Sequence, residues 1–227
     1  MKSYKAVIFD FDMTIADSEK AILHCLNLTA EHFSYKPMAP ELIRPVIGNI
    51  PEIMLEHITG EHDGEKLKEM KLWYRQVSAE KMSAMIRFFP GVKEGLAVLQ
   101  KAGIKTGVVS LKLYELMRVP LERDGVLSYL DRILGLDQVK AHKPDPDGLF
   151  RMAKEFMLDV KDMLYVGDSL VDQKTAWNAG MDFAAMLLGA TSREQFLREG
   201  PMTASFSSFD ELAAALLPQR KGTFTAG

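Results

Sequence analysis

The sequence predicts an α/β protein: a doubly wound parallel sheet with an all-α domain inserted after its first strand. Two observations lead to this class. Apolar strand patterns alternate with helical patterns from Phe88 onwards, as in parallel sheets with right-handed crossovers. Between residues 16 and 86 the periodicity is helical, with no convincing strand pattern. We therefore expect a Rossmann-like core from residues 1–15 and 87–217, a helical cap domain from 16–86, and a mobile tail from 218–227.

The first predicted strand is the apolar run Ala6 to Phe9, which ends in two aspartates, Asp10 and Asp12. An extended backbone directs alternate side chains to the same face, so the two carboxylates are expected to point the same way. Two anions held this close require a cation. A hard dication with oxygen ligands is the one we expect.

The inserted segment divides into three helical stretches. The first is capped by Asp17 or Ser18 and ends before Pro37. The second covers about residues 39–60 and is interrupted by prolines and a glycine, and the third runs from about 62 to 86. A helical insertion of this length is expected to cover the end of the sheet.

The remaining elements alternate. Asp145 and Pro146 are expected at the N-cap and first position of one helix. In order, the sequence predicts a helix ending at 101, a strand at 104–109, a helix at 113–123, a strand at 132–136, a helix at 146–157, a strand at 163–168, a helix ending at 180, a strand at 183–188, a small edge strand at 204–207 and a closing helix.

Polar residues that end the strands are the candidates for a site. Ligands of doubly wound sheets bind outside the carboxyl ends of the strands. Asp10, Ser110 and Asp168 follow three different predicted strands, so we expect them to meet in one crevice. Asp172 adds a second acidic pair with Asp168. Such close carboxylates would repel one another without a metal, and together with a carbonyl and waters they would suit Mg²⁺.

Three further residues fit the chemistry of a phosphoryl group. Ser110 is either an ordinary turn residue or a phosphoryl ligand, because its hydroxyl and the N–H groups after it suit a phosphoryl oxygen. Lys143 lies in a loop before Pro144, where it is either solvated or offsets the carboxylates and holds a phosphoryl group. Thr14 either orients the neighbouring carboxylate and contacts substrate or is an ordinary helix-start threonine.

Composition excludes several classes of protein. The formal net charge is -3, so no basic surplus points to nucleic acid or to an anionic membrane. The single cysteine, Cys25, cannot form an intrachain disulfide. The N-terminus has no signal-peptide pattern, and no apolar run approaches membrane-spanning length. We expect a cytoplasmic protein, a monomer or homodimer.

The motifs resemble those of the haloacid dehalogenase-like superfamily, and the helical insertion resembles the cap of the members related to phosphoglycolate phosphatase and β-phosphoglucomutase. The resemblance implies that Asp10 is a nucleophile forming an aspartyl-phosphate and that Asp12 is the general acid and then the base. The four ordered motifs are Asp10-Phe11-Asp12-Met13-Thr14, Ser110, Lys143 and Gly167-Asp168-Ser169-Leu170-Val171-Asp172.

The resemblance also implies the ligands of a magnesium ion. These are Asp10, the Asp12 carbonyl and Asp168, with Asp172 as an indirect or water-mediated partner. Ser110 and Lys143 would bind the phosphoryl oxygens.

The remaining features of the motifs concern substrate. Met13 stands where many members have glycine, and Leu111 where close relatives often have a polar residue. Lys112 fits the phosphoglycolate-phosphatase pattern and either reaches the site or faces solvent. Arg44 lies in a similar cap segment and either meets an anionic group or is a plain surface arginine.

The function that these features favour is a magnesium-dependent phosphatase acting on a small phosphorylated metabolite, phosphoglycolate-like or a sugar phosphate. A β-phosphoglucomutase-like mutase is an alternative with the same motifs. A receiver-type phospho-acceptor domain is an alternative from another class, but its acceptor aspartate belongs to a later strand.

Overall fold

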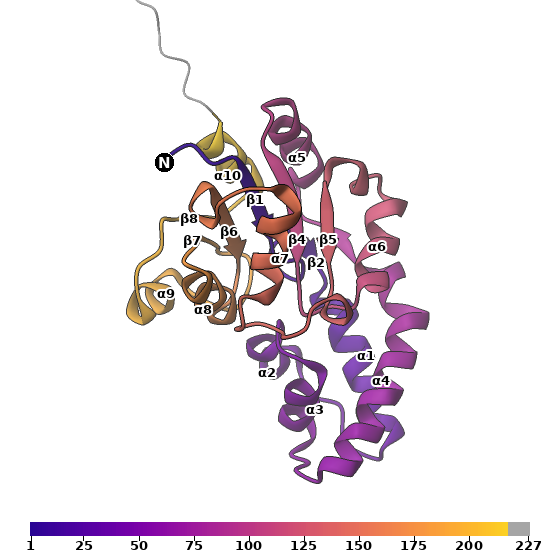
Figure 1. Ribbon diagram of the computed structural model, residues 1–227. Helices are drawn as coiled ribbons and strands as arrows, with labels where there is room; N and C mark the ends of the chain where they lie inside the picture. The colour runs from indigo at the N-terminus through magenta and orange to yellow at the C-terminus, as the bar shows by residue number, and fades with distance from the viewer. Residues whose placement is uncertain (218–227) are drawn as a thin grey trace, which may run out of the picture.

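The computed structural model describes residues 1–217, and the tail predicted at 218–227 lies outside the described residues. Within that range a sheet of six parallel strands has the order β5-β4-β1-β6-β7-β8 (Figure 1). The predicted α/β class is confirmed. The strands are β1 (Ala6–Phe9), β4 (Lys105–Val109), β5 (Arg132–Leu134), β6 (Met163–Gly167), β7 (Asp182–Met186) and β8 (Ala204–Phe206).

Helices cover both faces of the sheet, because the central strands are apolar on both faces. Val7 and Phe9 of β1 belong to one apolar core, while Ala6 and Ile8 belong to the other. The first core includes residues of α5 (Val92–Lys101), α6 (Tyr114–Arg123) and α10 (Phe209–Leu216), and the second includes residues of α7 (Asp147–Phe156), α8 (Leu170–Ala179) and α9 (Arg193–Glu199).

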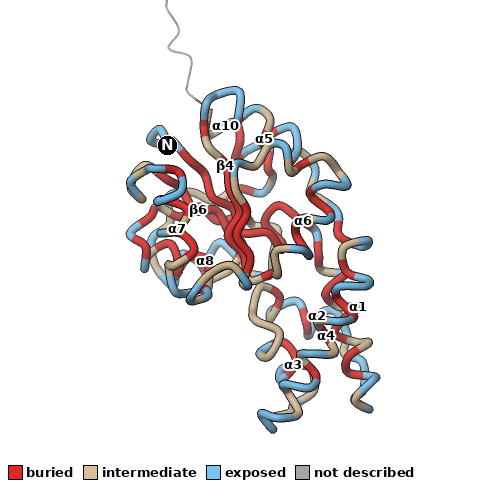
Figure 2. Tube along the Cα trace, turned by 45° about the vertical axis from the view of Figure 1, so that its right-hand side comes forward, coloured by how far each residue is buried: buried red, intermediate tan, exposed pale blue. Residues whose placement is uncertain are grey.

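The inserted residues form a helical lobe, defined here as α1 to α4 with the turns between them. Figure 1 shows this lobe beyond one end of the sheet, and Figure 2 shows buried residues continuing from the strands into it. Its elements are α1 (Glu19–His32), α2 (Pro40–Ile43), the short 3₁₀ helix η1 (Arg44–Val46), α3 (Pro51–Thr59) and α4 (Gly64–Met85).

Local signals explain where the lobe helices begin and end. Proline occupies the first position of α2 and of α3, where its missing N–H costs no hydrogen bond. Gly60 ends α3 with a φ of 67°, a conformation that glycine adopts without steric cost. The Asp63 side chain accepts hydrogen bonds from the first N–H groups of α4.

Two short strands join the lobe to the sheet, and the sequence pattern did not predict them. β2 (Ala16–Asp17) pairs antiparallel with β3 (Arg87–Phe88), so both chain crossings between lobe and sheet lie side by side. Two residues are too few to show an alternating pattern, and their partner lies some 70 residues away. The prediction of no strand at the start of the insertion was therefore wrong.

Other differences concern boundaries and short helices. Helix α7 starts at Asp147 with Pro146 as its N-cap, one residue later than predicted, and the Asp145 carboxylate accepts a hydrogen bond from the Asp147 N–H. Helix α9 was not predicted, although Ser192 and Gln195 form a capping box at its start. Three short 3₁₀ helices complete the fold: η2 (Leu127–Tyr129), η3 (Leu136–Gln138) and η4 (Val160–Asp162).

Among residues 1–217 no helix combines the length and the apolar character needed to cross a membrane.

Candidate active site

The residues that directly follow three of the strands lie at the carboxyl ends of the central strands of the sheet. Strand β1 lies between β4 and β6, where the chain reverses its direction of winding, and this is the position where doubly wound sheets bind ligands. Asp10, Ser110 and Asp168 directly follow these three strands, and all three are buried. The backbone N–H of Asp10 donates to the Val166 carbonyl at 2.8 Å, which fixes the turn after β1 beside β6.

Three carboxylates form a cluster at this point. One oxygen from each of Asp10, Asp168 and Asp172 lies within 4.8 Å of the others, and all three residues are buried. Helix α8 positions Asp172, because Ser169 donates to its Oδ2 from both the backbone N–H, at 3.1 Å, and the hydroxyl, at 2.5 Å. Three convergent carboxylate oxygens are hard donors of the kind that Mg²⁺ prefers, so this cluster fits a divalent cation.

Burial and mutual repulsion alter the acidity of the cluster. Burial raises the pKa of Asp10 to about 7, the Lys143 ammonium partly opposes that rise, and the charges of Asp172 and Asp12 add to it. Burial, followed by the neighbouring charges of Asp172 and Asp10, raises the pKa of Asp168 well above its ordinary value. A bound dication would favour the ionised carboxylates and reverse these shifts.

Lys143 is the positive charge within the cluster. Its Nζ donates to Asp10 Oδ1 at 2.7 Å, to Asp172 Oδ1 at 2.6 Å and to the Tyr165 hydroxyl at 2.9 Å. The residue is only 7% exposed. Burial alone would lower the pKa of Lys143, but the two carboxylates outweigh burial and raise it well above its ordinary value. Lys143 is therefore not a solvated loop lysine. It offsets the charges of the carboxylates, which was the other interpretation of the sequence.

Asp12 stands apart from the cluster and pairs with Lys112. The Lys112 Nζ lies 2.9 Å from Asp12 Oδ1 and donates to Oδ2 at 3.1 Å, and both side chains are buried. Lys112 thus reaches the site rather than facing solvent. The backbone N–H of Lys112 also donates to Ser110 Oγ at 3.4 Å, so the chain after β4 contributes both residues to one wall. The Asp12 side chain is not part of the carboxylate cluster, and its predicted contribution to a metal site is its backbone carbonyl.

A cavity opens onto Asp10 and Asp12 between the sheet and the helical lobe; we call it the reaction cavity. Ser110, Leu111 and Lys112 line it from the core side. The space open to the centres of water-sized groups is only about 50 Å³. The lobe contributes Ile22, Gly48, Asn49, Pro51, Met54, Tyr74, Arg75, Ser78 and Met82 to the lining.

Sequence and structure comparisons identify the family. The family model described as haloacid dehalogenase-like hydrolase matches residues 7–186. The chain belongs to this family. It is similar to a phosphoglycolate phosphatase from Nitrosospira multiformis, with 31% identity over 182 residues that cover 78% of this chain and 80% of the relative. These matches confirm the family and the class of enzyme expected from the motifs.

Two further similarities extend over most of the chain. A pyrophosphatase, PpaX, from Bacillus velezensis is 30% identical over 185 residues, which cover 82% of this chain and 84% of the relative. A crystal structure described as a haloacid dehalogenase-like hydrolase from Bacteroides fragilis is similar with a TM-score of 0.88 and 30% identity, covering 92% of this chain and all of that one (100%).

In this haloacid dehalogenase-like hydrolase, Met13 occupies a backbone conformation that suits glycine. Its φ is 58°, in the left-handed region of backbone conformation that residues other than glycine rarely adopt. The side chain is 4% exposed and packs into the core that includes the lobe. Burial of this side chain thus accompanies the unusual backbone conformation.

Two predicted substrate contacts are placed elsewhere. Thr14 was expected to orient the neighbouring carboxylate or contact substrate, but it is fully buried and its hydroxyl donates to Asp168 Oδ1 at 3.2 Å. The tight turn around Met13 directs it there. Arg44 lies outside the reaction cavity, where its Nε is 3.2 Å from Glu19 Oε2 and its side chain is 48% exposed. It borders a neighbouring cavity that Asp168 and Ser169 also line.

The sequence interpretation missed two residues that the hydrolase brings to the site. The sequence pattern placed Tyr165 of β6 among the apolar residues of a buried strand. Its hydroxyl, however, lies 3.0 Å from both Asp172 Oδ1 and the Val109 carbonyl oxygen. Its polar tip in an otherwise apolar strand was the available signal. Arg75 of α4 lines the reaction cavity, and its spacing of three and seven residues from the buried Ser78 and Met82 was the corresponding signal.

Proposed function

We propose that this haloacid dehalogenase-like hydrolase is a magnesium-dependent phosphatase that hydrolyses a small phosphomonoester, phosphoglycolate-like or a sugar phosphate, through an aspartyl-phosphate. One observation carries the proposal. Asp10 is 3% exposed, is held by Lys143 within a carboxylate cluster that fits a dication, and borders the same cavity as Asp12. The similar proteins are a pyrophosphatase and a phosphoglycolate phosphatase, which also supports phosphate chemistry.

The first chemical step transfers the phosphoryl group to the enzyme. A carboxylate oxygen of Asp10 forms a bond to phosphorus while the bond from phosphorus to the leaving oxygen breaks. Asp12 gives its proton to that leaving oxygen, which departs as an alcohol. Ser110 and Lys143 hold phosphoryl oxygens during the transfer. When bound at Asp10, Asp168 and the Asp12 carbonyl, with Asp172 as an indirect partner, magnesium would supply positive charge that offsets the phosphoryl oxygens and keeps Asp10 ionised.

The second step restores Asp10. A water molecule attacks phosphorus and gives a proton to Asp12, which now acts as the base. The bond between phosphorus and Asp10 breaks, and inorganic phosphate leaves. Lys112 contacts both oxygens of the Asp12 carboxylate, which supports a role in orienting that carboxylate toward the cavity in both steps.

Residues 16–86 act in this proposal as a cap that restricts the substrate. The reaction cavity is narrow, with about 50 Å³ open to the centres of water-sized groups. A small leaving group is therefore favoured, and closure of the lobe would exclude bulk water from the phosphoryl group. The cytoplasmic location and the monomeric or homodimeric state stay predictions.

The alternatives differ in product and in family. A β-phosphoglucomutase-like enzyme would use the same residues but would require a bisphosphate and give an isomer rather than free phosphate. A receiver-type domain does not agree with the family match over residues 7–186.

The test is phosphate release by the purified protein and its Asp10→Asn variant. Substrates are phosphoglycolate, sugar phosphates, nucleotides and pyrophosphate, each with and without Mg²⁺. We expect magnesium-dependent release from at least one of them and a loss of about 10⁴-fold or more in Asp10→Asn. Asp210→Asn, at an exposed position of α10, is the matched control. Magnesium-dependent turnover retained by Asp10→Asn would contradict the proposal, and an isomer as product would support the mutase.

A further inference from the structure

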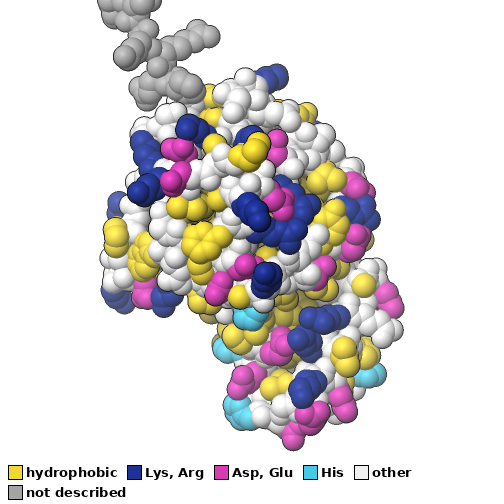
Figure 3. All heavy atoms as spheres, in the orientation of Figure 1, with side chains coloured by type: hydrophobic (Ala, Val, Ile, Leu, Met, Phe, Trp, Pro, Cys, Tyr) yellow, Lys and Arg dark blue, Asp and Glu magenta, His cyan; other side chains and the backbone are white. Residues whose placement is uncertain are grey.

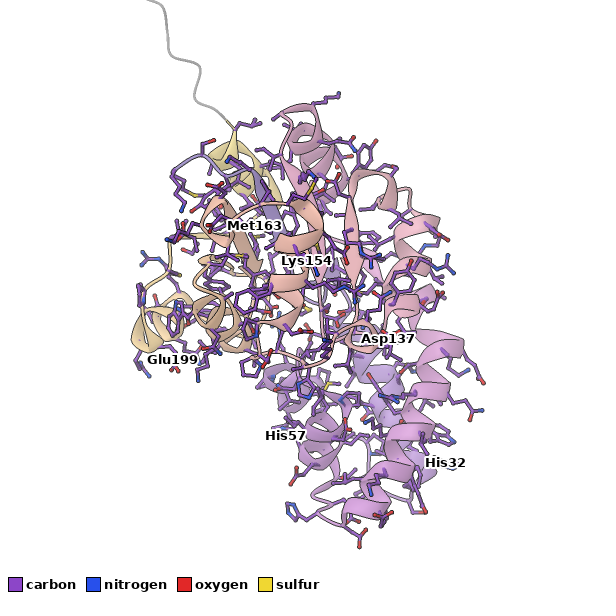
Figure 4. All side chains as sticks on the ribbon, viewed as in Figure 1. His32, His57, Asp137, Lys154, Met163 and Glu199 are labelled. Carbon is purple, nitrogen blue, oxygen red and sulfur yellow. The ribbon has the colours of Figure 1, made fainter. Side chains whose placement is uncertain are left out.

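A second cavity adjoins the reaction cavity and shares Arg75 and Leu136 with it. We call it the mouth cavity. It lies between the lobe helices α3 and α4 and the loop that follows β5, and Figure 4 shows Asp137 of this loop where the sheet part meets the lobe. The space open to the centres of water-sized groups is about 270 Å³. Its lining residues are Ile50, Glu52, Lys71, Arg75, Leu136, Val139, Lys140 and His142.

The mouth cavity carries an excess of positive charge. Lys71 is neutralised by an ion pair with Glu52. Arg75 and Lys140 form no ion pair among residues 1–217, so they are the uncompensated cations of the lining. His142 uses Nδ1 for the Lys143 carbonyl, at 3.2 Å. Figure 3 shows Lys and Arg side chains on both sides of the junction between the sheet part and the lobe.

Arg75 has unused hydrogen-bonding capacity where the two cavities meet. Its Nε is buried and has no hydrogen-bond partner among the described residues. A buried donor without a partner is costly, and a guanidinium group presents a fork of donors that matches a carboxylate or phosphate. The other cations of the reaction site have other roles in the proposed function, since Lys143 contacts Asp10 and the reacting phosphoryl group, and Lys112 contacts Asp12.

We propose that the mouth cavity is a subsite for a second anionic group of the substrate, with Arg75 as its main contact and Lys140 at its rim. The proposal rests on the proposed function, because it concerns the end of the phosphomonoester that does not react. A phosphomonoester in the reaction cavity whose leaving group ends in a carboxylate or a phosphate would present that anion to Arg75. Binding at this remote end would position the phosphorus against Asp10.

The test compares substrates that differ only in the second charge. Phosphate release is measured with Mg²⁺ for phosphoglycolate, for ethyl phosphate and for ethylene glycol bisphosphate, which separates a carboxylate from a phosphate as the second anion. We expect the wild type to prefer the anionic substrates. In Arg75→Met the ratio of kcat/KM for the preferred anionic substrate to that for ethyl phosphate should fall about 10- to 100-fold. Arg75→Lys, which keeps the charge and loses the fork, should lie between them.

A matched control removes a cation from the same helix outside the mouth cavity. Lys68 is exposed on α4 and pairs with Glu65, so Lys68→Met should leave the substrate ratio at its wild-type value. A fall of equal size for charged and neutral substrates in Arg75→Met, or no fall, would overturn the subsite.

A binding experiment decides the subsite without turnover. The affinities of 3-phosphonopropionate and propylphosphonate, which differ in the carboxylate, are measured by calorimetry with Mg²⁺ on wild type, Arg75→Met and Arg75→Lys. We expect the wild type to favour the carboxylate compound and Arg75→Met to lose that preference. Equal affinities for the two compounds in the wild type, together with equal kcat/KM for ethyl phosphate and for both anionic substrates, would refute the subsite. Failure of the phosphatase itself would instead appear as absence of phosphate release while this preference persists.

Discussion

Replacement of Lys143 by methionine tests whether this lysine holds the carboxylate cluster together. The variant keeps an unbranched apolar side chain but removes the ammonium group that contacts Asp10, Asp172 and Tyr165 at 2.6 to 2.9 Å. Removing one partner of a buried ion pair costs about 3–5 kcal/mol, because the remaining charge stays buried without compensation. We expect a loss of this size in the free energy of unfolding at pH 8 without metal.

The pH dependence of that loss follows from the pKa of Asp10. Burial raises this pKa to about 7 and Lys143 lowers it, so the variant should have a still higher value. A carboxyl whose pKa is higher in the folded than in the unfolded state binds more protons when folded, and stability then falls as the pH rises between the two values. The loss should therefore be smaller at pH 5, where Asp10 is protonated, than at pH 8.

The assay is urea unfolding in a chelator at pH 5 and pH 8. Lys154→Met, at an exposed position of α7 (Figure 4), is the control and should change the free energy of unfolding by less than about 0.5 kcal/mol. An equal loss at both pH values, or a larger loss at pH 5, would refute the view that uncompensated carboxylates cause the destabilisation.

Two other predictions concern Met13 and the metal. Met13→Ala should lower the free energy of unfolding by about 2–5 kcal/mol through the lost side chain. Met13→Gly should lose about 1 kcal/mol less of the free energy of unfolding than Met13→Ala, because the φ of 58° is strained for alanine and unstrained for glycine. Urea unfolding measures both variants, and a more stable alanine variant would contradict this prediction. Mg²⁺ binding at pH 6.5 should release protons, since the pKa of Asp10 is about 7 without metal, and its affinity should rise with pH. Calorimetry in buffers of different ionisation enthalpy measures this release, and an absence of released protons would contradict the assignment of Asp10 as a ligand.

Local patterns were sufficient for the sheet and for the strand-end residues. The strands that border the site are largely buried, and Asp10, Ser110 and Asp168 directly follow β1, β4 and β6. Parallel strands bring their carboxyl ends to one edge, so the convergence of these residues followed from topology alone. The two-residue pairing of β2 with β3 did not, because it depends on a partner distant in sequence.

The sequence by itself determined the class of fold, the family motifs and the identity of the charged residues near the strand ends. Only the tertiary structure decided their partners: Asp12 pairs with Lys112 outside the carboxylate cluster, and Thr14 binds Asp168. It also decided which arginine faces the reaction cavity, Arg75 in place of Arg44. The physical reason is that a helical or strand pattern fixes the face on which a residue lies. The direction of that face depends on how the lobe packs on the sheet, which is set by contacts between residues far apart in the chain.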